Sequence, residues 1–231
     1  MRHRIFIDAI APTVTVSGDE FHHGIRVVRL REGEEIEVFD ARGRMANAVV
    51  ESIARDHAVL NIGDEIPSRE SPIDIHLAMA IIQLDKFDLV LQKATELGVR
   101  SIIPLITERI ELRPERYSGK ADRWQRIVFE AVKQSGRSIV PTIEPPTEFA
   151  EALKREGTRI IFDADADNRA TAQPRNRATA FIGPEGGWTT HELDLARTHG
   201  AHFQRLGPRR LRAETAAIAA LAIIASRFGD L

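Results

Sequence analysis

The first seventy residues contain short runs rich in apolar and β-branched residues, separated by polar turn signals. Runs of this length and composition predict β-strands, and a turn such as Asp40-Ala41-Arg42-Gly43-Arg44 predicts a reversal between two of them. One short helix is expected around residues 21–30. Several strands at this spacing indicate a small barrel. The predicted strands cover residues 4–7, 35–39, 45–53 and 57–62.

From residue 73 onward, strands alternate with amphipathic helices. Apolar side chains at 87, 90, 91, 94 and 97 share one face of a predicted helix, which Asp85 is expected to cap and Gly98 to end. Thr189 and Glu192 have the spacing of a capping box, and Gly200 is expected to end the helix that they begin. The other predicted helices cover 120–134, 148–155 and 212–228, and the predicted strands cover 73–80, 101–106, 159–163, 178–182 and 202–206.

This alternation predicts an α/β domain with a mostly parallel sheet that is covered on both faces. The polar segment Pro67-Ser68-Arg69-Glu70-Ser71-Pro72 is bracketed by prolines, which is typical of a linker. The sequence therefore predicts two domains, 1–70 and 73–231, joined at about 67–72. Periodicity alone favours an unknotted doubly wound sheet, because true knots are almost absent from protein folds.

The composition excludes several kinds of site. The chain has 231 residues and no cysteine, which excludes disulfides, a cysteine nucleophile, an iron–sulfur cluster and a cysteine-type zinc site. Charge interrupts the N-terminal residues too early for a signal sequence, and the longest uncharged apolar run, 216–225, is half of what a membrane helix needs. We therefore expect a cytoplasmic protein.

The charge balance at first argues against binding to nucleic acid. The chain carries 32 Lys and Arg against 34 Asp and Glu, a net charge of −2, whereas a small protein that binds nucleic acid through charge alone is usually basic. The charges are segregated, however: residues 100–137 hold nine basic and five acidic side chains, and residues 205–212 hold four arginines and no acid. Only five of the 32 basic residues are lysines, and this excess of arginine fits either a GC-rich genome or a preference for phosphate ligands. We expect the basic segments to share a face, and RNA affinity to fall steeply with salt.

A glycine-rich loop follows the strand predicted for 178–182: Phe181-Ile182-Gly183-Pro184-Glu185-Gly186-Gly187-Trp188. Glycines let backbone groups approach a ligand closely, and the following helix N-terminus adds N–H donors. The loop matches neither the dinucleotide fingerprint nor the P-loop, so nicotinamide and nucleoside-triphosphate cofactors lose support. The alternative is a turn that needs positive φ angles.

A second unusual loop is Leu206-Gly207-Pro208-Arg209-Arg210-Leu211-Arg212-Ala213-Glu214-Thr215. Its arginines crowd a helix N-terminus, which is unfavourable without an anionic partner. Either a ligand supplies that partner, or Glu214 and neighbouring carboxylates do. Both loops follow the carboxyl ends of predicted strands, where α/β sheets bind ligands.

No metal site is expected. The run Asp163, Asp165 and Asp167 fails as an EF-hand, because Asn168 and Pro174 stand where Gly and Glu are needed, and a solvated acidic loop explains it better. The pair His22-His23 lacks a second cluster of ligands. Lys93 and Glu96 form either a solvated pair or part of a site.

Further motifs lie before the two loops: His23-Gly24-Ile25-Arg26-Val27-Val28-Arg29, Val38-Phe39-Asp40, Gln92-Lys93-Ala94-Thr95-Glu96-Leu97-Gly98-Val99, Thr107-Glu108-Arg109 and Glu130-Ala131-Val132-Lys133-Gln134-Ser135-Gly136-Arg137. Together with the loops they resemble the bacterial 16S ribosomal RNA uracil-N3 methyltransferases, the small-subunit methyltransferase E family of the SPOUT superfamily. The resemblance covers essentially the full length, and residues 163–177 match it least.

The resemblance implies a fold, a cofactor and partners that composition and periodicity do not show. The N-terminal barrel would be PUA-like and bind RNA, and the C-terminal SPOUT α/β domain would contain a deep trefoil knot. The cofactor would be S-adenosylmethionine, and the enzyme would be a homodimer acting on 16S rRNA or the small ribosomal subunit, without membrane or metal. The implied cofactor-binding residues are Ile182, Gly183, Pro184, Glu185, Gly186, Gly187, Leu206, Gly207, Leu211, Arg212, Thr215 and Ala216.

Methylation of uracil N3 requires loss of its proton and stabilisation of the negative charge that develops. We assign Arg212 and Arg109 to charge stabilisation and uracil positioning, and Glu185 or Glu214 to orienting an arginine or receiving the proton. The expected RNA-binding residues are Arg26, Arg29, Arg109, Arg113 and Arg137, the last on an RNA phosphate. Two alternatives stay open: another SPOUT RNA methyltransferase, acting on ribose 2′-O or a tRNA base, and a non-catalytic RNA-binding or ribosome assembly factor.

Overall fold

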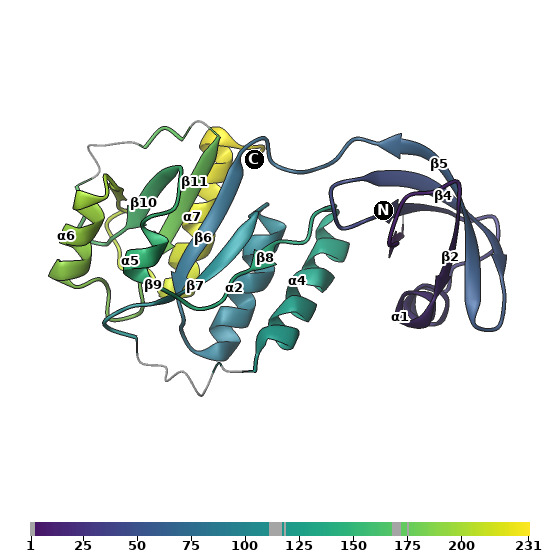
Figure 1. The fold of residues 1–231 in the computed structure, drawn as a ribbon, viewed down its shortest axis with the longest axis horizontal. Coiled ribbons are helices and arrows are strands. Elements are labelled where there is room, and N and C mark those ends of the chain that lie inside the picture. Colours follow the sequence, from purple (N-terminus) through teal and green to yellow (C-terminus); the bar gives the residue numbers. More distant parts are fainter. Residues whose placement is uncertain (1–2, 111–116, 118, 168–171, 175) are drawn as a thin grey trace. The chain divides into compact units, whose positions relative to one another are not determined.

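The computed structural model describes residues 3–110, 117, 119–167, 172–174 and 176–231 (Figure 1), and the side chains of residues 26 and 27 lie outside that description. The chain forms two compact units. The first consists of the residues up to Glu70 together with Val132–Val140, and the second consists of Ser71–Ala131 and Pro141–Leu231. No helix in the described part of the chain is long and apolar enough to cross a membrane.

The first unit contains a curled five-stranded sheet in the order β1-β3-β4-β5-β2. β1 pairs with β3 in parallel and the other pairs are antiparallel. Two breaks in the β4–β5 register bend the sheet, as bulges do. Ile36 and Val38 are fully buried in its core, as alternation along that strand predicts. The strands are β1 (Arg4–Phe6), β2 (Thr13–Ser17), β3 (Glu35–Phe39), β4 (Met45–Ile53) and β5 (His57–Ile66).

The helix expected at 21–30 has an unusual form. A single α-helical turn, α1 (Gly18–Phe21), continues into a π-helix, η1 (His22–Val28). Arg29 ends it in the left-handed region at φ 64°, and the Leu30 N–H donates to the Gly24 carbonyl at 3.1 Å. Strand β2 was not predicted from the sequence, although its residues alternate in burial.

The second unit contains a sheet in the order β12-β10-β11-β6-β7-β8, with β9 also paired to β7, and every described pair is parallel. This confirms the predicted parallel α/β architecture. The central strands β6 and β11 are buried nearly throughout, as expected where helices cover both faces. The strands are β6 (Asp74–Ala80), β7 (Ser101–Ile106), β8 (Thr142–Ile143), β9 (Thr147–Glu148), β10 (Thr158–Phe162), β11 (Arg177–Ile182) and β12 (His202–Gln204).

The helices lie on the two faces of this sheet (Figure 1), with α7 against β11 and β6 and beside α2, and with α5 against β7 and beside α6. The capping box is present as predicted, with the Thr189 side chain accepting from the Glu192 N–H. Asp85 does not cap α2, which begins at Leu84 with Gln83 as its N-cap, two residues earlier than expected. The helices are α2 (Leu84–Glu96), α4 (Ala121–Ser135), α5 (Phe149–Ala152), α6 (Thr190–Thr198) and α7 (Ala213–Phe228). The knot implied by the resemblance stays a prediction.

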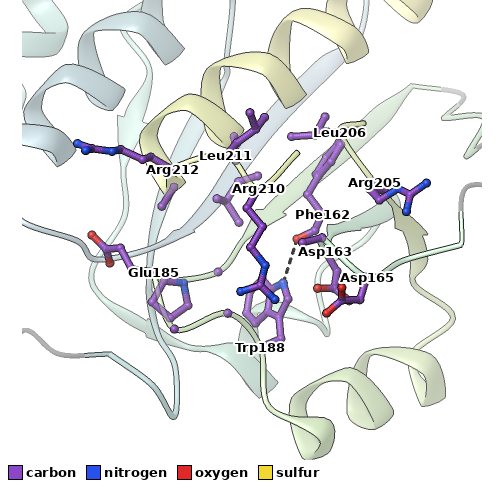
Figure 2. A pocket seen from close by; sticks show the side chains of 18 of the residues that line it. Phe162, Asp163, Asp165, Glu185, Trp188, Arg205, Leu206, Arg210, Leu211 and Arg212 are labelled. Carbon is purple, nitrogen blue, oxygen red and sulfur yellow. Dashed lines mark hydrogen bonds between the residues drawn. The ribbon is translucent and has the colours of Figure 1, made fainter. Parts of the chain in front are cut away.

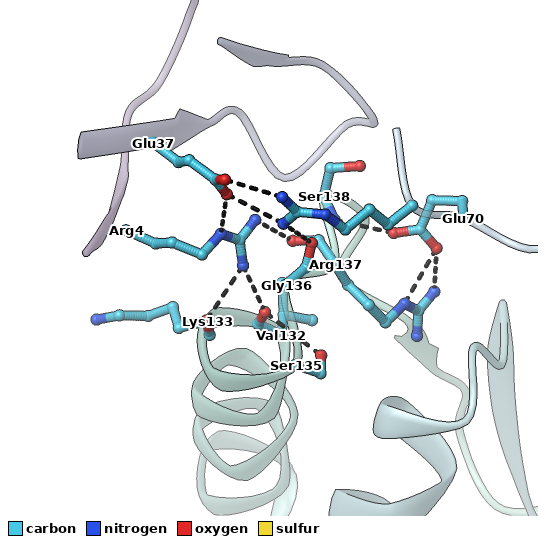
Figure 3. Close-up of polar contacts among 10 residues, drawn as sticks. Arg4, Glu37, Glu70, Val132, Lys133, Ser135, Gly136, Arg137 and Ser138 are labelled. Atoms are coloured by element: carbon cyan, nitrogen blue, oxygen red, sulfur yellow. Dashed lines mark hydrogen bonds and ion pairs between the residues drawn. The ribbon is translucent and has the colours of Figure 1, made fainter. Parts of the chain in front are cut away.

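The division into two domains differs from the sequence prediction in one respect: Val132–Val140 belongs to the first unit. Figure 3 shows how the first unit holds this segment. The Arg4 guanidinium donates to the carbonyls of Val132, Lys133 and Arg137 at 2.7–3.1 Å, and so satisfies acceptors that the end of a helix leaves unpaired. These contacts join residues more than 120 positions apart, so no local pattern could reveal them.

Candidate active site

A cavity lies at the carboxyl ends of three neighbouring strands of the second unit (Figure 2). It has a volume of about 530 Å³ and is formed by the segments that follow β10, β11 and β12, together with the start of α7 and Arg109. Ligands of open parallel sheets bind at this edge, because the connecting loops leave a crevice there. The architecture therefore places both unusual loops of the sequence around one cavity.

The glycine-rich loop is anchored by Trp188. This buried indole donates from Nε1 to the Phe162 carbonyl at 3.1 Å, which joins the loop to the end of β10. A Cβ at Gly183 would lie 3.1 Å from Trp188 Cε2, so close packing accounts for that glycine. Gly187 has φ +67°, so the positive-φ explanation applies to it.

Arg109 reaches the same loop from the end of β7. Its Nη1 donates to the carbonyls of Gly186 at 2.8 Å and Trp188 at 3.2 Å. Next to it, the Glu108 N–H donates to Glu192 Oε1 at 3.0 Å. A hydrogen bond from His191 lowers the pKa of the exposed Glu108 carboxyl below its usual range. The segment after β7 is therefore tied both to the loop and to the start of α6.

The arginine-rich loop exposes positive charge at the N-terminus of α7. Arg212 is the N-cap residue and makes no side-chain capping bond. Among the described residues, Arg209, Arg210 and Arg212 have no ion-pair partner within 4.0 Å, and all three are exposed. Glu214 does not pair with them, and its Oε2 is buried without a hydrogen-bond partner. The alternative in which Glu214 neutralises these arginines is not seen in this part of the chain.

Most residues assigned to the cofactor from the sequence lie around this cavity. Ten of the twelve line it, whereas Gly207 and Thr215 do not. Gly207 has φ +99°, a backbone conformation that favours glycine. The ten are Ile182, Gly183, Pro184, Glu185, Gly186, Gly187, Leu206, Leu211, Arg212 and Ala216.

The three residues assigned to catalysis, Arg109, Glu185 and Arg212, all line the cavity. Glu185 is exposed, and its Oε1 lies 3.7 Å from Lys86 Nζ of α2. Its carboxylate is therefore paired with a lysine and not with an arginine of the cavity. Arg109 has a backbone partner on the glycine-rich loop, whereas Arg212 is unpaired within the described chain.

The residues assigned to RNA do not form one group. Arg137 requires a correction: its side chain is 4% exposed and donates from Nη2 to Glu70 Oε2 at 2.6 Å. A guanidinium held in this way serves the structure of the first unit, so a phosphate contact is not supported. Arg29 is exposed after the π-helix, Arg26 lies within that helix, and Arg113 lies outside the described residues.

The residue assignments left out nine residues that line the cavity. Four of them lie within the two loops that the sequence singled out, and the other five stand at or just after the end of a predicted strand, which is the signal that could have identified them. The missed residues are Phe162, Asp163, Ala164, Asp165, Trp188, Arg205, Arg209, Arg210 and Ala213.

The pair of Lys93 and Glu96 has an ordinary role on the helix surface. Lys93 Nζ donates to both Glu96 carboxylate oxygens at 2.9 and 3.0 Å, so these residues form the surface pair that helix spacing allows. No group of three or more His, Asp or Glu that could hold a metal ion occurs among the described residues.

Two family models match the chain. A model described as RNA methyltransferase domain matches residues 69–225, and one described as RNA methyltransferase PUA domain matches residues 16–63. The first match covers the cavity and its loops, and the second covers most of the curled sheet.

Curated relatives and solved structures agree with these matches. The chain is 34% identical to ribosomal RNA small subunit methyltransferase E of Synechocystis over 93% of this chain and 73% of that protein. It is 30% identical to the protein of the same name from Bacillus subtilis, over 93% of this chain and 90% of that protein. A ribosomal RNA small subunit methyltransferase E from Neisseria gonorrhoeae, solved with S-adenosylmethionine bound, is 33% identical, with a TM-score of 0.90 and full coverage of both chains. A Legionella pneumophila methyltransferase solved with the same cofactor is 31% identical, with a TM-score of 0.87 and full coverage of both chains.

Proposed function

The chain belongs to the ribosomal RNA small subunit methyltransferase E family, and we propose that it methylates N3 of a uridine in 16S rRNA with S-adenosylmethionine as the methyl donor. The observation that carries this proposal is the cavity that the glycine-rich and arginine-rich loops form at the carboxyl ends of β10, β11 and β12. The two solved relatives hold S-adenosylmethionine, which supports the choice of cofactor. A ribosomal RNA substrate implies that the enzyme acts in the cytoplasm.

The residues around the cavity fit this cofactor in size and chemistry. A volume of about 530 Å³ lies within the range of small-molecule sites. Ile182, Leu206 and Leu211 offer apolar surface for an aromatic base. A Cβ added at Gly187 would meet nothing within 4 Å, so the backbone of the glycine-rich loop is open to close approach there. When bound, the cofactor supplies an activated methyl group on its sulfonium.

The residues of this chain would then align the reacting atoms and stabilise the charge that develops. The attacking N3 must be aligned with the methyl group at about 3 Å, and its proton must leave as negative charge develops on the ring. We assign Arg212 to stabilise that charge, because it is exposed at the cavity and stands at the positive end of α7.

Two carboxylates were candidates for the proton, and we favour Glu185. It is exposed at the cavity, where a water or a base can reach it, and its Oε1 lies 3.7 Å from Lys86 Nζ. Glu214 is less accessible, because one of its oxygens is buried. Arg109 keeps N–H groups besides Nη1 that can position the uracil, while Nη1 holds the glycine-rich loop.

The decisive experiment is mass mapping of methylated uridine in 16S rRNA from cells with and without this protein. The proposal expects one N3-methyluridine to disappear without the protein and to return when the gene is restored. Restoration with Arg212→Ala should leave the site unmethylated, whereas the control Arg197→Ala, which removes an exposed pair with Asp194, should restore it. Unchanged methylation without the protein would refute the proposed substrate.

A second measurement separates the enzyme from a non-catalytic RNA-binding factor. Purified protein should bind S-adenosylmethionine in a calorimetric titration, and absence of binding would exclude the methyltransferase reading. Methyl transfer to ribose 2′-O or to tRNA would appear as a different product in the mass map. Neither of these alternatives is favoured by the relatives, which are named as small-subunit rRNA enzymes.

We further propose that the enzyme is a homodimer and that the first unit binds RNA through a region that includes Arg26 and Arg29. Light scattering coupled to gel filtration tests the first point, and a fully active monomer would contradict it. For the second, RNA affinity should fall steeply with salt, because each neutralised phosphate releases counterions. Arg29→Ala should lower both the affinity and the slope of its salt dependence.

A further inference from the structure

We propose that Glu192 is a positioning residue for the methyl transfer. Its two carboxylate oxygens fasten the segment after β7 to the start of α6, and this decides where Arg109 lies at the cavity. The inference rests on the proposed function and gives Glu192 a role beyond the capping box in which the sequence placed it. Glu192 does not line the cavity, so its effect on the reaction passes through Arg109, which does.

Each carboxylate oxygen of Glu192 accepts from a different backbone N–H. Oε2 accepts from the Thr189 N–H at 2.8 Å, which completes the capping box at the start of α6. Oε1 accepts from the N–H of Glu108, at 3.0 Å and 84 positions earlier in the chain, just after the end of β7. Glu192 is 3% exposed, so water does not compete for these bonds. One buried side chain therefore joins two segments that lie far apart in the sequence.

The helix cap alone does not require a glutamate at position 192. Glutamine serves in a capping box as well, because one acceptor for the N-cap N–H is enough. A glutamine side chain has one oxygen and an NH2 group, and the NH2 group cannot accept from a second N–H. Burial of a carboxylate is unfavourable unless its oxygens are hydrogen-bonded, and here both are. The bond to Glu108 therefore explains why a carboxylate is needed.

The bond to Glu108 also places Arg109, which is the next residue in the chain. The Arg109 side chain lies close against the glycine-rich loop, because a Cβ added at Gly186 would lie 3.3 Å from Arg109 Cβ. Its Nη1 donates to the carbonyls of Gly186 at 2.8 Å and Trp188 at 3.2 Å. Hydrogen bonds weaken steeply when they are misaligned, so a displaced backbone at Glu108 would weaken both contacts.

These contacts form a closed ring. Trp188 is followed directly by Thr189, whose N–H is held by Glu192. Glu192 thus holds the end of the loop through Thr189 and holds Arg109 through Glu108, and Arg109 in turn holds the Trp188 carbonyl. A ring of this kind fixes the loop before a ligand arrives, which is what precise alignment of reacting groups requires.

A purely structural role in α6 is the competing explanation, and two substitutions separate it from the proposed one. Thr189→Ala removes the side-chain oxygen that accepts from the Glu192 N–H at 3.1 Å, and so weakens the helix start while both carboxylate bonds remain. Glu192→Gln keeps one acceptor for the cap and cannot make both carboxylate bonds. Urea unfolding of both variants measures how far each one destabilises the second unit.

Calorimetric titration of the full-length protein with S-adenosylhomocysteine tests the proposal. Glu192→Gln should weaken binding about three- to tenfold, the effect of one or two lost hydrogen bonds, and Thr189→Ala should change it by less than about twofold. In the Arg109→Ala background, Glu192→Gln should weaken binding by no more than a further factor of about two, because the contacts through which it acts are already gone.

A second measurement does not depend on a ligand. The Gly187 N–H donates to the Pro184 carbonyl at 2.9 Å, and amide hydrogen exchange over residues 183–188 should be faster in Glu192→Gln than in Thr189→Ala or the unaltered protein. If Glu192→Gln does not fold, Glu192→Asp takes its place with the same expected pattern, because its oxygens sit on a side chain one carbon shorter.

Three results would overturn the proposal. The first is an equal loss of affinity in Thr189→Ala and Glu192→Gln, because the helix start alone would then account for it. The second is a double variant whose loss is the product of the two single losses, because Glu192 and Arg109 would then act independently. The third is unchanged hydrogen exchange in Glu192→Gln. If the unaltered protein bound no S-adenosylhomocysteine, the proposed function would fail, whereas the exchange measurement would still decide whether Glu192 holds the loop.

Discussion

Arg109 donates from Nη1 to the backbone carbonyl of Gly186 at 2.8 Å, and so connects the end of β7 to the loop that follows β11. A second bond from the same nitrogen reaches the Trp188 carbonyl at 3.2 Å. The main-chain course of the glycine-rich loop therefore depends on a side chain from another strand. Arg109, which the sequence assigned to the reaction, therefore also fixes the glycine-rich loop that lines the cavity.

The role of Arg109 can be tested by separating cofactor affinity from turnover. Arg109→Ala removes both carbonyl contacts, so we expect S-adenosylhomocysteine to bind about tenfold more weakly. This is the effect expected when one or two hydrogen bonds from a charged donor are lost. Calorimetry measures the affinity, and single-turnover methylation at saturating cofactor measures the chemical step. His191→Ala is the matched control, because it removes the exposed bond to Glu108 and leaves Arg109 in place.

The opposite result would restore a purely catalytic role for Arg109. If Arg109→Ala lowered the single-turnover rate about a hundredfold with unchanged cofactor affinity, the loop contacts would be incidental and the arginine would act on the uracil alone.

Two glycines of the loop should respond differently to alanine. At Gly183 the added Cβ would lie 3.1 Å from the Trp188 ring. This ring cannot move away easily, because it packs against Phe149 with 4.8 Å between the two ring centroids. We expect Gly183→Ala to cost about 1–3 kcal/mol and to shift tryptophan fluorescence, as overpacking does. At Gly187 the Cβ would meet nothing, so Gly187→Ala should cost only about 1–2 kcal/mol of left-handed backbone strain.

Urea unfolding followed by tryptophan fluorescence distinguishes the two substitutions. A native emission spectrum in the Gly183 variant, with the spectrum altered in the Gly187 variant instead, would show that Trp188 does not pack as described.

Glu70 should be a main determinant of stability in the first unit. Its carboxylate accepts from Arg137 Nη2 at 2.6 Å and from the N–H groups of Ser138 and Ile139 at 2.9 and 3.0 Å. Glu70→Gln leaves the buried Arg137 guanidinium without its counter-charge, so we expect a loss of about 3 kcal/mol in the free energy of unfolding of this unit. Far-UV circular dichroism in urea is the suitable measurement, because both tryptophans, 124 and 188, lie in the second unit.

The control for Glu70 is Glu65→Gln, which removes an exposed ion pair with Arg44 in the same unit. Because such pairs contribute little, it should cost less than about 1 kcal/mol. Equal effects of the two substitutions would mean that the contacts of Glu70 are not stabilising.

His76 should make the second unit less stable in mild acid. Burial, with a contribution from the charge of Arg177, lowers the pKa of this histidine, whose Nδ1 lies 2.7 Å from Ser101 Oγ and whose Nε2 is buried without a partner. In the unfolded chain its pKa is near 6.5, so below that pH the unfolded state binds a proton that the folded state resists. The contribution of His76 is therefore complete above pH 6.5 and is lost as the pH falls toward the folded-state pKa.

The pH effect is measured as the difference between the unaltered protein and His76→Asn, which retains a polar group near Ser101. As the pH falls from about 7.5 to about 5.5, the free energy of unfolding should decrease more steeply for the unaltered protein than for the variant. The difference in slope should reach up to about 1.4 kcal/mol per pH unit. Parallel pH profiles would show that the pKa of His76 does not differ between the folded and unfolded states.

Much of the local structure could be predicted from the sequence because its causes are local. β-rich composition and flanking turn signals gave the bounds of β3 and β4, and apolar spacing gave the buried face of α2. The capping box at Thr189 and the glycine-rich loop were likewise visible, since each depends on residues a few positions apart. Strand β2 was missed because a single short run is ambiguous without its partner β5.

The sequence by itself determined the two-part organisation, the strand and helix types, the two loops at strand ends and, through the resemblance, the family. The tertiary structure decided which charges meet. Arg137 pairs with Glu70 instead of facing outward, and Arg4 holds a helix end 128 residues away. Arg109 reaches a carbonyl 77 residues along the chain, and Arg210 lines the same cavity as Asp163 and Asp165. The physical reason is that a charged side chain pairs with the polar or charged group that the fold brings next to it. The spacing of residues along the chain does not encode which groups become neighbours.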